Sequence, residues 1–210
     1  MITGSGLGLL NLKDCKTLNL LPSLLVPVIW FLLMALWPSR ARAQTSAPFQ
    51  LDTLHVQHID FNGRTQQGML VCNRAITEDL RAIFAELYRQ RYPIERIRPI
   101  SEYDNDDERS MQANNTSCYC YRRVEGSQKL SKHARGLAVD VNPLYNPCVR
   151  RRKDGTLLIQ PATGRPYIDR NKSFKYKLTQ YDLCYRLFIQ HGFRWGGSWR
   201  TVKDYQHFEK

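Results

Sequence analysis

The stretch from Ser131 to Asp140 holds the residues of this sequence that are best suited to chemistry. His133 and Asp140 stand on either side of Gly136, and the residues after the glycine begin an alternating apolar strand. A neutral imidazole nitrogen and a carboxylate oxygen are ligands that a catalytic zinc ion accepts, usually as three protein ligands with a fourth position open to water. This stretch offers two such ligands, so a third has to come from elsewhere in the chain.

Taken alone, the stretch also fits a surface loop pair or a hydrogen-bonded structural pair. Gly136 favours the ligand interpretation, because glycine lets the backbone turn sharply and approach a bound group closely. Ser131 adds a small hydroxyl group two residues before His133.

The C-terminal end supplies the missing ligand type. His207 offers a second imidazole, and Asp204 offers a carboxylate three residues before it. On a regular strand, side chains three residues apart point to opposite faces. The chain therefore has to bend, or end its strand pairing, between these two residues if both are to reach one metal ion.

Two adjacent arginines, Arg122 and Arg123, come shortly before the His133 loop. In a zinc hydrolase, a guanidinium group that faces the metal can hold the oxyanion formed when water attacks a carbonyl. The alternative for either arginine is a surface charge, and the sequence leaves open which of the two faces the metal.

Together, the two halves resemble the motif of the zinc D-Ala-D-Ala peptidases, which include VanY-type carboxypeptidases, vancomycin-resistance dipeptidases and phage L-Ala-D-Glu endolysins. The motif S-x-H-x-x-G-x-A-x-D is followed by an acidic residue three positions before a histidine near the C-terminus. It is filled here by Ser131, His133, Gly136, Ala138, Asp140, Asp204 and His207. The resemblance covers most of the chain from about Leu51 onward. The flanking segment Trp195-Gly196-Gly197 is similar to that of a VanY-like branch of the family.

The resemblance implies a role for each matching residue. It implies three ligands of one Zn²⁺ ion, which are His133, Asp140 and His207. Asp204 would be the general base, and Arg122 the catalytic arginine that steadies the substrate carbonyl. Ser131 and Trp195 would bind the substrate. Cys118 and Cys120 depart from the family pattern, in which an alanine and an asparagine more commonly precede that arginine.

The resemblance also implies a fold and a substrate. The fold would be a single α+β domain in which a small antiparallel sheet carries the zinc site and helices flank it, as in hedgehog domains and D,D-peptidases. The substrate would be the stem peptide of peptidoglycan, cut as by a D-alanyl-D-alanine carboxypeptidase. The alternatives are an L-Ala-D-Glu endopeptidase of the same family and, in a different class, a non-catalytic hedgehog-like module that binds the cell wall.

The first 43 residues have the pattern of a signal peptide. Two lysines precede an apolar run over residues 18–37, and Ala41-Arg42-Ala43 supplies the small-x-small pattern of a cleavage site. We expect cleavage near Ala43, a short linker over residues 44–50 and a catalytic domain over residues 51–210. The alternative is an uncleaved N-terminal membrane anchor, since the run approaches the roughly 20 apolar residues that span a bilayer. Either way, we expect export to the periplasm or cell envelope.

The chain is strongly basic, with a formal net charge of +12. Residues 1–43 carry four basic side chains and one acidic one, so their removal leaves +9. Such a surface favours polyanionic surroundings, which for an exported protein are cell-wall polymers and lipid headgroups. Because of export, we expect no nucleic-acid partner. We also expect no stable membrane insertion after processing, and a monomer. The densest charge, over residues 150–153, is predicted to be a solvated loop.

Five of the six cysteines follow the signal segment, and export places them where disulfides can persist. An odd number leaves at least one cysteine free or paired between chains. Cys118, Cys120 and Cys148 are one thiolate short of a structural zinc site and lack C-x-x-C spacing. We expect a disulfide from Cys118 or Cys120 to Cys148 or to another cysteine.

The remaining pattern predicts the scaffold around the site. Residues 51–61 alternate and turn at Asn62-Gly63 into a second strand. His55 and His58, on the first strand, point to opposite faces and are predicted to be structural or exposed. The other predicted elements are a helix over 76–91, a strand over 94–100, an acidic loop over 104–108, and a hairpin or an extended excursion over 155–170. A second helix is predicted from an N-cap at Thr179 to His191, stopped by Gly192, with His191 in its C-terminal turn, where it interacts with the helix dipole and is not a ligand.

Overall fold

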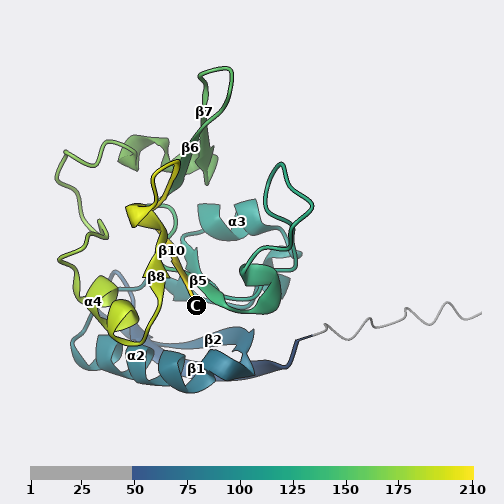
Figure 1. Ribbon diagram of the computed structural model, residues 1–210. Coiled ribbons are helices and arrows are strands. Elements are labelled where there is room, and N and C mark those ends of the chain that lie inside the picture. The colour runs from purple at the N-terminus through teal and green to yellow at the C-terminus, as the bar shows by residue number, and fades with distance from the viewer. Residues whose placement is uncertain (1–48) are drawn as a thin grey trace, which may run out of the picture. The chain divides into compact units, whose positions relative to one another are not determined.

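An N-terminal hairpin and a helix pack together in the computed structural model, which describes residues 49–210 (Figure 1). Strand β1 (Leu51–Ile59) pairs antiparallel with β2 (Thr65–Asn73), and alternate side chains of both strands are buried. The predicted turn at Asn62-Gly63 joins them, with Gly63 in the left-handed region at φ +77°. The predicted hairpin is therefore confirmed.

Helix α2 (Thr77–Arg89) packs against β1 and confirms the first predicted helix. Its apolar residues recur every three or four positions, so one face is buried while the other carries charged side chains. The buried face consists of Thr77, Leu80, Ile83, Phe84 and Leu87. A single 3₁₀ turn, η1 (Arg74–Ile76), precedes the helix and is capped by the side chain of Asn73.

A three-stranded antiparallel sheet lies at the centre of the fold, in the order β5-β10-β8. Strand β10 (His207–Glu209) pairs with β5 (Ala138–Asp140) on one side and with β8 (Arg194–Trp195) on the other. Phe208, in the middle of β10, is fully buried and stacks on Phe188, with ring centroids 4.2 Å apart. The described residues thus combine small sheets with few helices, which is compatible with the expected single α+β domain.

A second three-stranded sheet has the order β7-β6-β9. Strands β6 (Cys148–Arg151) and β7 (Leu157–Gln160) form a hairpin that projects at the top of Figure 1, and β9 (Val202–Asp204) pairs with β6. The predicted solvated loop over 150–153 is therefore wrong for its first half, because Arg150 and Arg151 belong to β6. Of the hairpin or extended excursion predicted over 155–170, the first part is the second strand of this hairpin, and the 3₁₀ helix η4 (Ala162–Tyr167) follows it.

The segment between α2 and the site corrects two predictions. The strand predicted over 94–100 shrinks to β3 (Arg96–Ile97), which pairs in parallel with β4 (Asn115–Thr116). Pro99 has no N–H group for a ladder, and the 3₁₀ helix η2 (Ile100–Tyr103) begins directly after it. The predicted acidic loop is partly helical, because Asp106 caps helix α3 (Asp107–Gln112), whose first turn favours acidic residues.

The second predicted helix begins later than expected. Helix α4 (Leu183–Gln190) is capped by Asp182, whose Oδ1 accepts a hydrogen bond from the backbone N–H of Cys184 at 2.8 Å. Thr179, the predicted cap, accepts from the N–H of Tyr181 in the turn before the helix. Gly192, at φ +82°, stops the helix as predicted.

Three histidines outside the motif have the structural or exposed positions that were predicted. His55 is exposed, and His58 is buried with its Nδ1–H donating to the carbonyl oxygen of Ile94 at 2.7 Å. His191 lies at the C-terminal end of α4, with Nδ1 at 3.1 Å from Oδ1 of Asp79.

The expected disulfide is not formed. The five cysteines of the described region are all free and buried: Cys72, Cys118, Cys120, Cys148 and Cys184. They behave as small apolar side chains of the interior, and burial raises the pKa values of their thiols.

The predicted signal peptide over 1–43 and most of the predicted linker over 44–50 lie outside the described residues. Within residues 49–210, no helix has the length and apolar character required to cross a membrane.

Gly136 joins the loop that carries His133 to strand β5. Its φ of +66° is unfavourable for residues with a side chain, and a Cβ atom here would lie 2.6 Å from the backbone nitrogen of Asn73. That nitrogen donates to the carbonyl oxygen of Gly136 at 2.8 Å, and the Asn73 side chain donates to the carbonyl of Arg135. The close approach expected at this glycine is therefore made to the end of β2, which holds the His133 loop in place.

Gly136→Ala should destabilise the fold by at least about 2 kcal/mol, because it combines left-handed strain with a backbone clash. Gly126→Ala is the matched control, since Gly126 has φ +72° but nothing within 4 Å of its Cβ position. The control should cost only about 1 kcal/mol. Urea unfolding measures both, and equal losses would contradict the proposed docking of the loop on β2.

Candidate metal centre

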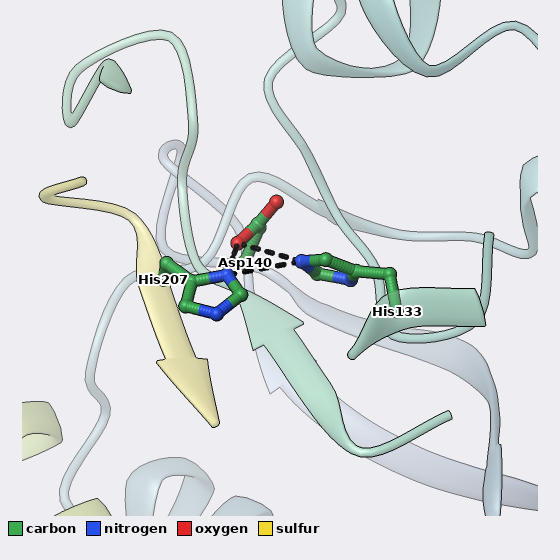
Figure 2. Close-up of side chains that lie close together, drawn as sticks. All are labelled: His133, Asp140 and His207. Carbon is green, nitrogen blue, oxygen red and sulfur yellow. Dashed lines mark hydrogen bonds and ion pairs between the residues drawn. The ribbon is translucent and has the colours of Figure 1, made fainter. Parts of the chain in front are cut away.

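The two halves of the motif meet where β5 ends and β10 begins. Asp140, the last residue of β5, is directly opposite His207, the first residue of β10. His133 comes from the adjacent 3₁₀ turn η3 (His133–Arg135), and Figure 2 shows the three side chains pointing toward one point. All three are buried, and their nearest ligand atoms lie within 4.8 Å of one another.

The distances in this cluster fit a four-coordinate metal ion. His133 Nε2 lies 3.1 Å from His207 Nδ1 and 3.3 Å from Asp140 Oδ1, and His207 Nδ1 lies 3.1 Å from the same oxygen. Zinc ligands about 2.0–2.1 Å from the metal at tetrahedral angles are separated by about 3.4 Å. The three atoms are therefore spaced like one face of a zinc coordination sphere.

Hydrogen bonds on the far side of each ring fix which nitrogen faces the centre. His133 Nδ1 lies 2.7 Å from the carbonyl oxygen of Cys118, which can only accept, so this nitrogen carries the hydrogen. His207 Nε2 faces the Glu209 carboxylate at 3.4 Å and donates in the same way. With those hydrogens in place, His133 Nε2 and His207 Nδ1 are the nitrogens that would offer a lone pair to a metal ion at the centre.

The buried carboxylate of Asp140 requires a positive charge nearby. The burial of Asp140 disfavours its charge, but the neighbouring His133 and His207 outweigh burial and hold the pKa of Asp140 well below its usual range. Burial likewise disfavours a charge on His207, but hydrogen bonds to Asp140 and Glu209 raise its pKa to about 10. A buried carboxylate beside two imidazole lone pairs is stable only with a cation, either protons or a metal ion.

Asp204 ends β9, and the chain bends at Tyr205 and Gln206 before β10 begins. This bend meets the condition derived from the D-x-x-H spacing, because β9 pairs with β6 whereas β10 pairs with β5. Oδ1 of Asp204 is buried without a hydrogen-bond partner among the described residues. Burial raises the pKa of Asp204 to about 6, which suits a group that takes up and releases a proton near neutral pH.

Gly196 explains why Trp195-Gly196-Gly197 accompanies this site. A Cβ atom on Gly196 would lie 2.7 Å from the backbone oxygen of Asp204 and 3.3 Å from Cβ of His207. Only glycine allows the segment after β8 to pack this closely against both residues.

Arg122 and Arg123 differ in their surroundings. Arg122 Nε forms a 2.6 Å ion pair with Oδ2 of Asp107 at the start of α3, and its charge interacts with Asp140 and Asp204. Arg123 is exposed, and its guanidinium donates to the carbonyl oxygen of Gln128 in its own loop. The structure thus places Arg122 nearer to the centre than its neighbour.

Ser131 is buried at the edge of the centre, and its Oγ accepts a hydrogen bond from the backbone N–H of His133 at 2.9 Å. The hydroxyl hydrogen stays available to a bound peptide. Ser131 therefore shapes the loop that carries His133 while it lines the cavity beside it.

Trp195, predicted to bind the substrate, is not among the residues that line the cavity over the cluster. Its indole packs in the core, and Nε1 donates to the carbonyl oxygen of Tyr205 at 2.9 Å. The tryptophan in the cavity wall is Trp199, whose ring centroid lies 5.3 Å from that of His207. Sequence reasoning missed Trp199, and its place at the end of the Trp-Gly-Gly-Ser-Trp segment was the available signal.

A cavity of about 870 Å³ opens over the cluster and is large enough for a peptide segment. Its walls come from α3, the loop after β4, η3, the β6–β9 sheet and β10. Charged side chains of both signs line it, including Asp107, Arg122, Lys132, Arg150, Arg194 and Glu209.

Comparison with known proteins gives one family. Residues 125–210 match the family model described as D-alanyl-D-alanine carboxypeptidase. The match supports a peptidase. It contains the three candidate ligands and Asp204, agrees with the resemblance drawn from the motif, and begins after Arg122. No curated protein and no solved structure matches the chain.

Removal of one candidate ligand should abolish tight metal binding. We expect the refolded protein to bind one Zn²⁺ per chain, and His207→Ala to lower that affinity by at least about 100-fold, more than is typical for a supporting residue. His55→Ala, on the exposed face of β1, is the control and should bind like the unaltered protein. Competition against a chromogenic chelator measures both, and undiminished affinity of His207→Ala would refute the assignment.

Proposed function

We propose that this protein is an exported zinc metallopeptidase that hydrolyses peptidoglycan stem peptides as a D-alanyl-D-alanine carboxypeptidase. The observation that carries the proposal is the convergence of His133, Asp140 and His207 beside Asp204. These residues lie within the span that matches a carboxypeptidase family. Two imidazole nitrogens, one carboxylate oxygen and a nearby second carboxylate are the parts of a hydrolytic zinc site.

The donor set supports one zinc ion held by Nε2 of His133, Oδ1 of Asp140 and Nδ1 of His207. When bound, the ion would lower the pKa of a coordinated water to about 7 and polarise the substrate carbonyl. Its charge would also neutralise the buried carboxylate of Asp140 directly, in addition to the more general interaction of that carboxylate with Arg122.

The protein's own residues would move the proton and hold the developing charge. Asp204 would accept a proton from the attacking water at its free Oδ1 and then pass it to the departing amine nitrogen. Arg122, oriented by its ion pair with Asp107, would stabilise the negative charge on the carbonyl oxygen. The Ser131 hydroxyl would donate to the peptide beside the reacting bond.

Two alternatives make different demands on the same site. An L-Ala-D-Glu endopeptidase would use the same metal and base but cut nearer to the glycan. A non-catalytic wall-binding module would need neither an ionised Asp204 nor an unpartnered Oδ1. The intact base beside three intact ligands favours an enzyme.

Digestion of purified peptidoglycan sacculi by the mature protein tests the proposal. We expect zinc-dependent release of D-alanine from pentapeptide stems, identified by mass spectrometry. Release of fragments with a new N-terminal D-Glu would support the endopeptidase instead. Tight binding to sacculi with no released product would favour the wall-binding module.

Asp204→Ala separates the base from the ligands. The variant should keep zinc binding, because Asp204 is not among the three ligands, but should lose hydrolysis by about 10²- to 10⁴-fold, the usual contribution of a positioned base. Asp169→Ala serves as the control, because Asp169 is an exposed carboxylate that does not belong to the motif. Full activity of Asp204→Ala would remove it from the proposed mechanism.

A further inference from the structure

Arg150 reaches the cavity because of its position on β6. Cys148, two residues before it, is directly opposite Asp204 in the β6–β9 pair. Residues two apart on a strand share a face, so Arg150 points to the same side of the sheet as Cys148, and both line the cavity over the metal cluster. Arg151 lies on the other face and is exposed.

The guanidinium of Arg150 is not neutralised by the protein. Its Nη1 donates to the backbone carbonyl of Glu125 at 3.2 Å, while its Nε is buried without a partner. Among residues 49–210, Arg150 forms no ion pair, and the carboxylate of Glu125 pairs with Arg152 instead, at 3.7 Å. Two other cavity arginines are neutralised, since Arg122 pairs with Asp107 and Arg194 pairs with Glu209.

The position of Arg150 suits a particular part of the substrate. In the proposed reaction, Asp204 returns its proton to the departing amine nitrogen, so the residue being released lies beside Asp204. In a carboxypeptidase substrate, that residue carries a free carboxylate, whose carbon is about 2.5 Å from the amine nitrogen. Arg150 is about 7 Å along β6 from the residue opposite Asp204, a separation that a long arginine side chain can bridge.

We propose that Arg150 binds the terminal carboxylate of the substrate and thereby makes the site select peptides with a free C-terminus. This inference rests on the proposed peptidase function and deepens it. Arginine suits the task because its planar group can donate two parallel hydrogen bonds to a carboxylate. An endopeptidase substrate has an amide at that position and would leave the guanidinium without its partner.

Paired substrates test the inference. An acylated Lys-D-Ala-D-Ala peptide and its C-terminal amide differ only in the charged group. Arg150→Gln should lower kcat/KM for the acid by about 10- to 100-fold, the usual effect of losing a charged hydrogen bond, chiefly through KM. The same variant should leave the slow cleavage of the amide within about twofold. Arg150→Lys should recover part of the loss, because it keeps the charge.

Arg151→Gln is the matched control, since this neighbour is exposed and donates to the carbonyl oxygen of Gly155 in the hairpin turn. It should leave both substrates unaffected. An equal loss on acid and amide in Arg150→Gln, or no loss at all, would overturn the inference while leaving the peptidase function in place.

Binding provides a second measurement that does not depend on turnover. In the zinc-loaded Asp204→Asn protein, calorimetry should find the acid bound at least about tenfold more tightly than the amide, and Arg150→Gln should abolish that difference. If the unaltered protein hydrolyses neither peptide but this preference holds, the proposed function fails and the carboxylate site stands. Equal binding of acid and amide would overturn the carboxylate site.

Discussion

The pairing of Asp140 with His207 is the constraint on which the site depends. These residues are 67 positions apart in the chain and become direct neighbours only because β5 and β10 pair antiparallel. Phe208, the next residue of β10, stabilises this pairing because it is fully buried and stacks on Phe188 of α4. Because side chains alternate between the two faces of a strand, a shift by one residue would turn His207 away from Asp140. Packing of the core therefore fixes the register of the site.

The site lies where two small sheets meet. The β5-β10-β8 sheet carries two of the candidate ligands, and the β7-β6-β9 sheet carries Asp204 and Arg150. Only Tyr205 and Gln206 separate β9 from β10. This short bend puts the candidate base and a candidate ligand on different sheets yet within one cavity, which a continuous strand could not do.

The two buried carboxylates of the site have opposite environments. Neighbouring imidazoles lower the pKa of Asp140, which keeps it ionised, whereas burial raises the pKa of Asp204 to about 6. Such a separation assigns different tasks to two chemically identical groups. The ionised carboxylate suits a metal ligand, and the other suits the transfer of a proton.

The family resemblance, and no local pattern, suggested Asp204 as the base. The residue types and spacing were enough to predict the candidate ligands, the bend between Asp204 and His207, the first hairpin and the approximate positions of two helices. These features follow from local rules of side-chain chemistry, periodicity and turns. The sequence did not predict that Trp195 packs in the core while Trp199 lines the cavity, because which aromatic side chain faces inward depends on the strand paired beside it. The cysteines, expected to form a disulfide, proved to be free apolar residues of the interior.

Arg150 illustrates the difference between the two kinds of information. In the sequence, it is one of four consecutive basic residues and indistinguishable from its exposed neighbours. In the structure, its place on β6, two residues from the partner of Asp204, turns its guanidinium toward the cavity. The sequence by itself determined which chemical groups are present and which could share a metal ion. Only the tertiary structure decided which charges face the candidate metal centre, because strand pairing sets side-chain direction over distances that local patterns do not encode.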